Sequence, residues 1–306
     1  MKGIKIISTG YYVPAKRVEN EAFTKIVDTS DEWITSRTGI KARHFVDSES
    51  TTDLAYQAAV KALAGIDRNQ IGIVIVASMT NQYYTPSTAC LLQKRLGLSE
   101  ELIAFDLSAA CSGFEYALST ARSLLITNKK PYALVVGAET LSSLLDFTDR
   151  STCVLFGDGA GAAVIGLQES LYYDLQGARG NEEALYASRD EGKLRMQGRE
   201  VFRFATHVIE ECIVKLCDEA KISVDEVDYF VLHQANGRII SHVYKKLKID
   251  SSKFYINLHE YGNTSGASVP LALAEMDEKG MLKRGMKIML VGFGGGLTYG
   301  ANLFEW

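Results

Sequence analysis

The sequence predicts an α/β fold built from two similar halves. Strands rich in Val and Ile alternate with helical stretches along the chain, a pattern typical of largely parallel sheets with helices on both faces. The order of strands and helices in the first half recurs in the second. Two such halves, which we place at 1–167 and 168–306, are expected to pack about a pseudo-twofold axis. A chance likeness between ordinary βαβ units is the alternative at this point.

The first half contains three predicted strands and a cysteine beside the second of them. An apolar strand covers 71–78, a second strand ends within 105–113, and a third covers 132–140, with helical stretches between them. Cys111 comes directly after the second strand and before a helical run.

The second half repeats this order with different polar residues. The strand at 227–236 leads into a basic helix at 238–248, the segment 256–268 precedes an Ala- and Leu-rich helix, and a last strand covers 287–296. Functional loops in such folds lie at the carboxyl ends of strands. A pseudo-twofold axis would therefore bring Cys111, Asn263 and the strand-ending His233 to one central site.

Composition and charge limit the classes of function. The chain has 306 residues, of which 47% are hydrophobic and 23% charged, as in an ordinary globular protein. A net charge of −4 argues against general nucleic-acid binding. The longest apolar stretches, such as 71–79, are too short to cross a bilayer. We expect neither a nucleic-acid partner nor a membrane.

The cysteines and the N-terminus point to the cytoplasm. The five cysteines show no paired spacing, and the N-terminal segment has no signal-peptide pattern, so reduced thiols in the cytoplasm are expected. No CxxC pair, HExxH motif or His/Asp cluster indicates a metal site.

Cys111 has the surroundings of a nucleophile. A sulfur before a helix lies near unpaired backbone N–H groups and the positive end of the helix dipole, which favour the thiolate. A buried structural cysteine is the alternative. His233 alone is equally typical of an incidental strand-end residue, and Asn263 between Gly262 and Thr264 of a turn residue. Their matching positions in the repeat favour a shared site.

The chain resembles the β-ketoacyl-acyl carrier protein synthase III family of condensing enzymes, almost from end to end. The matching segments, in order, are TSDEWITSRTGI (29–40), DLSAACSGF (106–114), DRSTCVLFGDGAGA (149–162), MQGREVF (196–202), HQANGRII (233–240), GNTSGAS (262–268) and GFGGGLTYG (292–300). The resemblance implies a thiolase-like, five-layered αβαβα fold.

The resemblance also implies a two-step reaction that starts fatty acid synthesis. An acyl-CoA acylates Cys111, and malonyl-acyl carrier protein then loses carbon dioxide and attacks the acyl-cysteine. His233 and Asn263 would hold the enolate oxygen, while the backbone N–H groups of Cys111 and Gly295 would form an oxyanion hole. Acyl-CoA and malonyl-acyl carrier protein are substrates, and no cofactor is implied.

The pairing of His233 with Asn263 favours an initiating condensing enzyme over the other enzymes that share this fold. Elongating synthases carry a second His in place of the Asn, and thiolases carry a second cysteine in the loop that here is GFGGG. The alternatives are a specialised relative that makes a secondary metabolite or a 3-oxopimeloyl carrier, a cysteine hydrolase, and a non-catalytic acyl-CoA-binding module.

Matching positions imply where CoA and its pantetheine arm bind. Thr29 and Glu32 are expected to form a capping box for a short helix that ends at Gly39, with Trp33 and Arg37 on one face. The residues expected to contact CoA or pantetheine are Thr29, Trp33, Arg37, Arg150, Gly198, Phe202 and Asn236.

A basic surface is expected to dock the carrier protein, and the loop that contains Thr85 is expected to border the acyl pocket. Acyl carrier proteins are acidic, so a positive patch would attract them; the residues expected to dock the carrier are Arg203, Arg238, Lys245 and Lys246. Thr85 stands where acetyl-primed relatives tend to carry Phe, so the acyl pocket could admit a longer or branched primer; the alternative is that Tyr83 or Tyr84 refills the space. In the family this loop reaches the partner subunit, which implies a homodimer.

Overall fold

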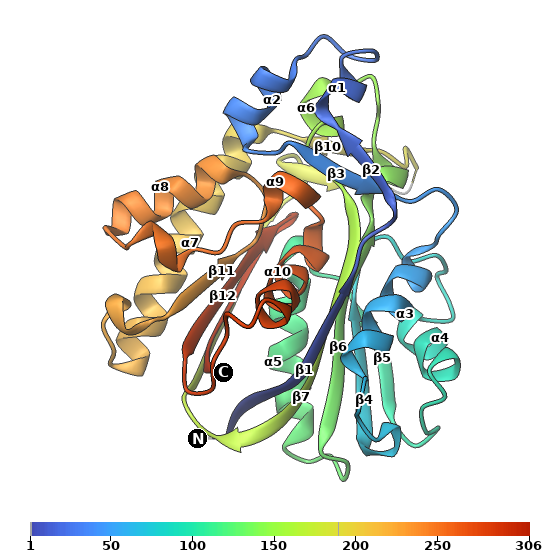
Figure 1. Cartoon of the computed structure of the whole chain (residues 1–306), viewed down its shortest axis with the longest axis vertical. Helices are drawn as coiled ribbons and strands as arrows, with labels where there is room; N and C mark the ends of the chain where they lie inside the picture. The colour runs from blue at the N-terminus through green and yellow to red at the C-terminus, as the bar shows by residue number, and fades with distance from the viewer. Residues whose placement is uncertain (1, 189) are drawn as a thin grey trace.

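Two main sheets alternate with helices in five layers in the computed structural model, which describes residues 2–188 and 190–306 (Figure 1). The first sheet has the order β1-β7-β6-β4-β5, and the second has the order β11-β12-β13-β8. The strands of the first sheet are β1 (Lys2–Tyr12), β4 (Ile71–Ala77), β5 (Ile103–Leu107), β6 (Tyr132–Thr140) and β7 (Asp158–Glu169). Those of the second are β8 (Tyr172–Asn181), β11 (Tyr229–Leu232), β12 (Lys287–Gly294) and β13 (Gly296–Glu305).

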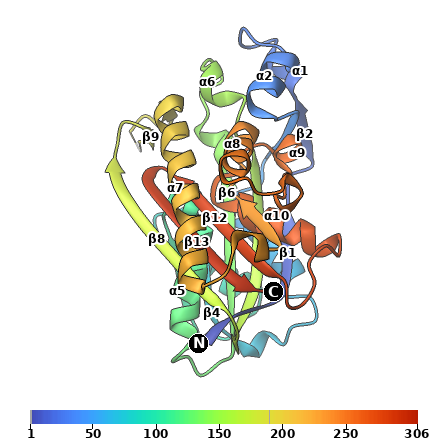
Figure 2. The same cartoon turned by 90° about the vertical axis from the view of Figure 1, so that its left-hand side faces the viewer.

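Helices fill the space between the sheets and cover both outer faces. The central layer holds α5 (Gly113–Leu125) and α10 (Ser268–Glu278), while α3 (Thr51–Ala62) and α4 (Thr88–Arg95) cover the first sheet. The second sheet is covered by α7 (Gly198–Ala220) and α8 (Gly237–Leu247), which face the viewer in Figure 2. The predicted five-layered αβαβα arrangement is confirmed.

The two main sheets draw on successive parts of the chain, residues 2–169 and 172–305. In each part a strand is followed by an outer helix, a short 3₁₀ turn, an inner helix and then two more paired strands. The segment 256–268 differs from its counterpart β5, because it forms no named strand: its pairing among the described residues is an isolated bridge between Asn263 and Phe156, and another joins Phe254, just before it, to Phe230. The division at residue 167 stays a prediction.

The expectation of largely parallel sheets is wrong. Parallel pairing joins β4 to β5 and β6, and β11 to β12, while β1–β7, β6–β7, β12–β13 and β8–β13 are antiparallel. The glycine-rich segment after β12 returns directly into β13 as a hairpin, so no crossover helix intervenes. Each half therefore ends in an antiparallel strand that follows its parallel core.

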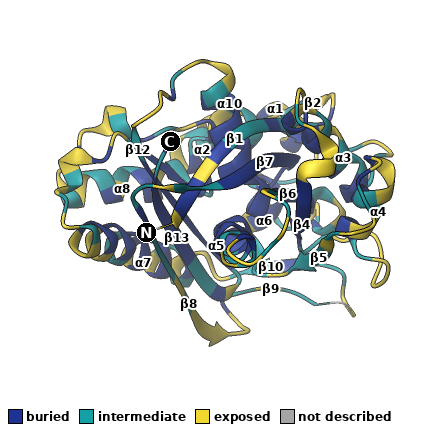
Figure 3. Ribbon diagram, turned by 90° about the horizontal axis from the view of Figure 1, so that it is seen from below, coloured by how far each residue is buried: buried dark blue, intermediate teal, exposed yellow. Residues whose placement is uncertain are grey.

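The central helices are the most deeply enclosed elements. The inner helix α5 is largely buried between the sheets, whereas the outer helices keep exposed faces (Figure 3). Phe114 and Leu118 of α5 pack with Val269 and Leu273 of α10 and with apolar residues of both sheets. Because apolar surface on both sides of each sheet is covered, the strands are almost continuously apolar, as in β4.

Short elements cap the end of the molecule opposite the two termini (Figure 1). These are β2 (Lys16–Glu19), α1 (Asn20–Phe23), α2 (Asp31–Thr38), β3 (Ala42–Phe45), α6 (Arg150–Cys153), β9 (Leu185–Ala187), β10 (Leu194–Met196) and α9 (Leu258–Tyr261). Within the described part of the chain, every helix is too short or too polar to traverse a lipid bilayer.

The predicted cap of α2 is wrong by one residue. Ser30, in an extended conformation, accepts a hydrogen bond from the backbone N–H of Trp33 at 3.0 Å, so Ser30 rather than Thr29 is the N-cap of the helix. Gly39 ends it with φ of 83°, as predicted.

Close packing of α10 on β7 makes Gly161 a sensitive position. A Cβ atom at Gly161 would lie 2.3 Å from the backbone nitrogen of Leu271 and 2.4 Å from the carbonyl carbon of Pro270. We expect Gly161→Ala to lower the free energy of unfolding by about 1–3 kcal/mol, because backbone has to move. Urea or thermal unfolding measures this. Gly180→Ala is the matched control, since a Cβ there meets no atom within 4 Å; equal stability of the two variants would contradict the packing argument.

Candidate active site

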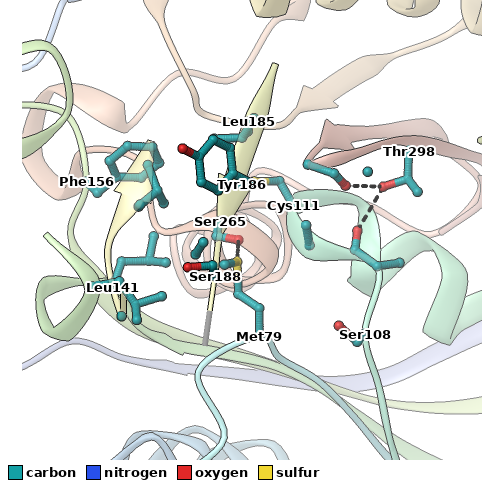
Figure 4. Close-up of a pocket in the computed structure, with 18 of the residues that line it drawn as sticks. Met79, Ser108, Cys111, Leu141, Phe156, Leu185, Tyr186, Ser188, Ser265 and Thr298 are labelled. Carbon is teal, nitrogen blue, oxygen red and sulfur yellow. Dashed lines mark hydrogen bonds between the residues drawn. The ribbon is translucent and has the colours of Figure 1, made fainter. Parts of the chain in front are cut away.

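Cys111 lies in a tight turn at the start of the inner helix α5. The turn η2 (Ala110–Ser112) joins β5 to α5, and Ala110 adopts a left-handed conformation with φ of 46°. Ser112 fixes the turn through its Oγ, which lies 2.9 Å from both the carbonyl oxygen of Ala109 and Thr298 Oγ1. Cys111 is 5% exposed and extends into a cavity (Figure 4).

Asn263 lies at the corresponding turn before α10. Its backbone N–H donates to the carbonyl of Leu155 at 2.9 Å, and its Oδ1 accepts the backbone N–H of Ser265 at 2.8 Å. Because a backbone N–H can only donate, this bond fixes Oδ1 as the acceptor and leaves the Nδ2 donors for another partner. Ser265 opens the turn η6 (Ser265–Ala267) with φ of 50°, as Ala110 does in η2.

His233 directly follows β11 and is held in one tautomer. Its Nδ1 lies 2.6 Å from Ser268 Oγ, and that oxygen also accepts the backbone N–H of Gln234 at 3.4 Å. The Ser268 hydroxyl proton is therefore available to Nδ1, which places the imidazole hydrogen on Nε2. Burial lowers the pKa of His233 to about 3, so the ring is neutral at physiological pH.

The structure brings these three side chains to one cavity. A cavity of about 110 Å³ is lined by Cys111, His233 and Asn263 together with apolar residues such as Phe293. Gly294 lies directly against the cysteine, since a Cβ there would be 2.9 Å from the Cys111 sulfur. The repeat in the sequence predicted this convergence.

A second, larger cavity lies on the other side of Cys111. It has a volume of about 570 Å³ and shares Cys111, Phe156 and Leu185 with the first. Gly295 lines it, as expected for a residue near the reacting centre. Thr85 does not; it is exposed, and the neighbouring Tyr84 lines the cavity instead.

The expectation that the surroundings of Cys111 favour the thiolate is wrong for this structure. Burial, together with the carboxyl groups of Glu139 and Glu115, raises the pKa of the Cys111 thiol to about 12, although a hydrogen bond from Ser265 opposes the shift. Sequence position shows a helix N-terminus but not how completely the sulfur is removed from water.

Residues expected to bind CoA form a cluster at the capped end of the molecule. The guanidinium groups of Arg37 and Arg150 lie 4.9 and 4.7 Å from the ring centre of Trp33. Asn236 caps α8 and donates from Nδ2 to the carbonyl of Arg37 at 3.2 Å, which links this cluster to the cavity. Thr29 precedes α2, and its Oγ1 is buried and has no hydrogen-bond partner among the described residues.

The other predicted binding residues divide between the cavity and the surface. Gly198, Phe202 and Asn236 line the smaller cavity beside the three central side chains. The four basic residues expected to dock a carrier are exposed: Arg203 on α7, and Arg238, Lys245 and Lys246 on α8. The contact between α7 and α8 places both sets on the same outer layer.

Several residues at the site were not predicted. Ser268 and Ser265 lie within the GNTSGAS segment, but their roles depend on contacts that sequence does not show. Glu139, a carboxylate at the end of an apolar strand, was the one available signal of a buried acid. Among the described residues, no group of three His, Cys, Asp or Glu side chains is arranged to hold a metal ion.

Comparison with known proteins identifies the family. Residues 105–176 match the model of 3-oxoacyl-[acyl-carrier-protein] synthase III, and residues 217–306 match that of its C-terminal part. The chain is 47% identical to the β-ketoacyl-[acyl-carrier-protein] synthase III of Clostridium acetobutylicum, over 100% of this chain and 99% of that protein.

Solved structures give the same answer. The 3-oxoacyl-[acyl-carrier-protein] synthase III of Aquifex aeolicus superimposes with a TM-score of 0.95 at 45% identity, covering 99% of this chain and 100% of that one. A priming β-ketosynthase of the R1128 polyketide pathway gives a TM-score of 0.93 at 33% identity, covering 98% and 96%. The chain belongs to the β-ketoacyl-[acyl-carrier-protein] synthase III family, whose members are condensing acyltransferases.

Proposed function

We propose that the chain joins an acyl group from acyl-CoA to malonyl-acyl carrier protein, with loss of carbon dioxide, to start fatty acid synthesis. The observation that carries this proposal is the shared cavity of Cys111, His233 and Asn263 in a member of this family. Identities of 45–47% to synthases of this name, against 33% to the polyketide priming enzyme, favour fatty acid synthesis over a specialised pathway.

Acyl transfer to Cys111 forms the first half of the proposed reaction. The sulfur attacks the thioester carbon, and the backbone N–H groups of Cys111 and Gly295 stabilise the negative oxygen of the tetrahedral intermediate. The cavity of about 570 Å³ then holds the acyl chain, with Leu141 and Leu144 among its apolar walls. This volume supports a primer longer than acetyl.

Decarboxylation forms the second half. The Nε2 hydrogen of neutral His233 and the Nδ2 hydrogens of Asn263 donate to the thioester oxygen of the malonyl group, which becomes negative as carbon dioxide leaves. The carbanion attacks the acyl-cysteine and releases the Cys111 sulfur. We propose that neither step uses a cofactor or a metal, and that acyl-CoA and malonyl-acyl carrier protein are the two substrates required.

The basic face of α7 and α8 supports docking of the acidic carrier. Arg203, Arg238, Lys245 and Lys246 are exposed on the layer that also borders the smaller cavity. Charges at the rim of an interface mainly raise the rate of association, and this contribution weakens with salt. Trp33, Arg37 and Arg150 stand at the same end and suit a CoA nucleotide, whose ring can stack and whose phosphates are anionic.

We also propose a homodimer in the cytoplasm. The first sheet ends at β5, whose outer edge makes no strand pairing among the described residues, and Ile103 at its start is 40% exposed. Tyr84 in the neighbouring loop is 83% exposed. An uncovered strand edge flanked by apolar side chains suits pairing with a second copy. All five cysteines are free, as expected in a reducing compartment.

The first test follows the two half-reactions separately. Incubation with a panel of acyl-CoAs is expected to add the acyl mass to Cys111, and malonyl-acyl carrier protein is then expected to remove it as the 3-oxoacyl carrier forms. Asn263→Asp replaces a donor by an acceptor, so decarboxylation is expected to fall about 10²–10³-fold while acylation persists. An adduct that only hydrolyses would indicate a hydrolase, and no adduct with any acyl-CoA would indicate a binding module.

Ser268→Ala tests the tautomer of His233. Loss of the hydroxyl removes the donor to Nδ1, and we expect malonyl decarboxylation to slow about tenfold, as for loss of a hydrogen bond worth about 1–1.5 kcal/mol. Acylation of Cys111 should be unchanged. Ser119→Ala removes a buried hydroxyl remote from the cavity and is the control. An unchanged decarboxylation rate in Ser268→Ala would show that Ser268 does not set the tautomer.

A charge on the strand edge tests the dimer. Sedimentation of the unaltered protein is expected to give twice the mass of the chain, and Ile103→Lys should shift it toward the monomer because the lysine would be desolvated at the proposed edge. Val214→Lys, on the outer face of α7 at a 42% exposed position, should leave the mass unchanged. A monomeric unaltered protein would refute the proposal.

A further inference from the structure

The structure leaves open which group receives the proton of the Cys111 thiol. The sulfur is buried, and burial raises its pKa to about 12, so the thiol keeps its proton at neutral pH. Burial also lowers the pKa of His233 to about 3, which makes this imidazole a poor proton acceptor at neutral pH. A nucleophile of this kind needs an adjacent base.

Glu139 is the buried carboxyl group best placed to act as such a base. It lies near the end of β6 with no exposure, and it accepts hydrogen bonds from Thr80 Oγ1 at 2.7 Å and from Ser78 Oγ at 3.3 Å, both to Oε2. The Met79 backbone N–H donates to both oxygens, at 3.3 and 3.2 Å. Three donors from one loop hold the carboxylate in place.

The oxygen atoms of these hydroxyl groups already accept hydrogen bonds from other groups, and this fixes the direction of their bonds to Glu139. Thr80 Oγ1 accepts the backbone N–H of Thr140 at 3.0 Å, and its own hydrogen is directed to Glu139 Oε2. Ser78 Oγ accepts the Thr80 backbone N–H at 3.1 Å and is likewise left to donate. Oε2 of Glu139 is therefore occupied by donors, and a new proton would go to Oε1.

Oε1 faces the active site through Ser265. The Ser265 hydroxyl donates to Glu139 Oε1 at 3.3 Å and lies 3.9 Å from the Met79 sulfur. Its turn η6 packs against η2, the turn that carries Cys111, and a hydrogen bond from Ser265 lowers the pKa of the Cys111 thiol. Ser265, Met79 and Cys111 all line the larger cavity, where Figure 4 shows their side chains around the same space. The left-handed φ of 50° at Ser265 costs about 1 kcal/mol or more in a non-glycine residue, and the hydroxyl that it carries bonds the carboxylate beside the cavity that Cys111 enters.

We propose that Glu139, acting through Ser265, accepts the proton of Cys111 as the sulfur attacks the acyl-CoA. The S–H bond breaks and its proton passes to Ser265 Oγ, while the Ser265 hydroxyl proton passes to Glu139 Oε1. The new C–S bond forms, the thioester bond to CoA breaks, and CoA leaves as a thiolate that takes a proton from water. In the second half-reaction the expelled Cys111 sulfur recovers the stored proton along the same path.

The titratable surroundings of Glu139 fit a base that works near neutral pH. Burial raises its pKa to about 7, and the hydrogen bonds from Thr80, Met79, Ser265 and Ser78 limit the rise. The loop 78–80 and the turn η6 present hydroxyl and amide donors to it, and Thr51 of α3 contacts Thr80 of that loop. The titratable group that faces it is Cys111, and Glu115 is the other carboxyl group that acts on this thiol.

Alkylation of Cys111 by iodoacetamide tests the proposal without acyl-CoA or carrier, so its outcome is separate from that of the proposed condensation. The Cys111 peptide is quantified by mass spectrometry, because Cys90 is exposed and also reacts. In the unaltered protein the rate should rise through an inflection near pH 7. In Glu139→Gln the rate at pH 7.5 should fall at least tenfold and the inflection should disappear.

Faster alkylation of Cys111 in Glu139→Gln would overturn the proposal. A carboxylate that only holds structure raises the thiol pKa, so its removal would make alkylation faster. Glu115→Gln is the matched control, since it removes the second nearby carboxyl group but leaves Ser265 in place, and alkylation should not slow. Ser265→Ala should reproduce the loss seen in Glu139→Gln, and it serves as the test if that variant does not fold.

The rate of decarboxylation distinguishes proton transfer by Glu139 from a general disturbance of the turn. Ser265 also holds Asn263 through its backbone N–H, so general damage to the turn would slow decarboxylation of malonyl-acyl carrier protein as much as alkylation. The proposal expects the decarboxylation rate of Glu139→Gln to stay within about threefold of the unaltered protein. An equal loss of both rates would assign Glu139 a structural role only.

Discussion

The close approach of the two turns η2 and η6 at the centre of the molecule is the constraint on which the site depends. A Cβ at Gly137 would lie 2.2 Å from the carbonyl oxygen of Gly266, so β6 meets η6 with no room for a side chain. A Cβ at Gly294 would lie 2.7 Å from the Cβ of Cys111. Glycines thus allow backbone from both halves to converge, and the inner helices α5 and α10 begin at this point.

Burial at this junction determines the chemistry more than any single residue type. Isolated charges are costly in buried surroundings, so His233 is held neutral, and Cys111 retains its proton at neutral pH. The same burial strengthens every hydrogen bond to a developing negative oxygen. Neutral donors are therefore the appropriate groups at the centre, while the charged side chains of α7 and α8 stay in solvent, where they can act at longer range.

The features that the sequence predicted correctly are those that depend on local patterns of residues. The spacing of apolar residues predicted the alternation of strands and helices, and the internal repeat predicted the convergence of Cys111, His233 and Asn263. Strand direction was not predictable from apolar composition, because the hairpin of β12 and β13 is built of buried strands like their parallel neighbours. The pKa of Cys111 was mispredicted for a related reason, since burial is a sum over contacts from distant segments.

The two carboxyl groups near Cys111 show how contacts with distant segments determine the protonation state of a residue. Glu115 is fully buried in the first turn of α5, its oxygens have no hydrogen-bond partner among the described residues, and burial raises its pKa to about 8. Glu139 is just as buried, but four donors surround it and burial raises its pKa only to about 7. Burial is the same, so the hydrogen bonds account for the difference. Glu115 is thereby suited to remain protonated at neutral pH, whereas Glu139 is poised to gain and lose a proton beside the sulfur.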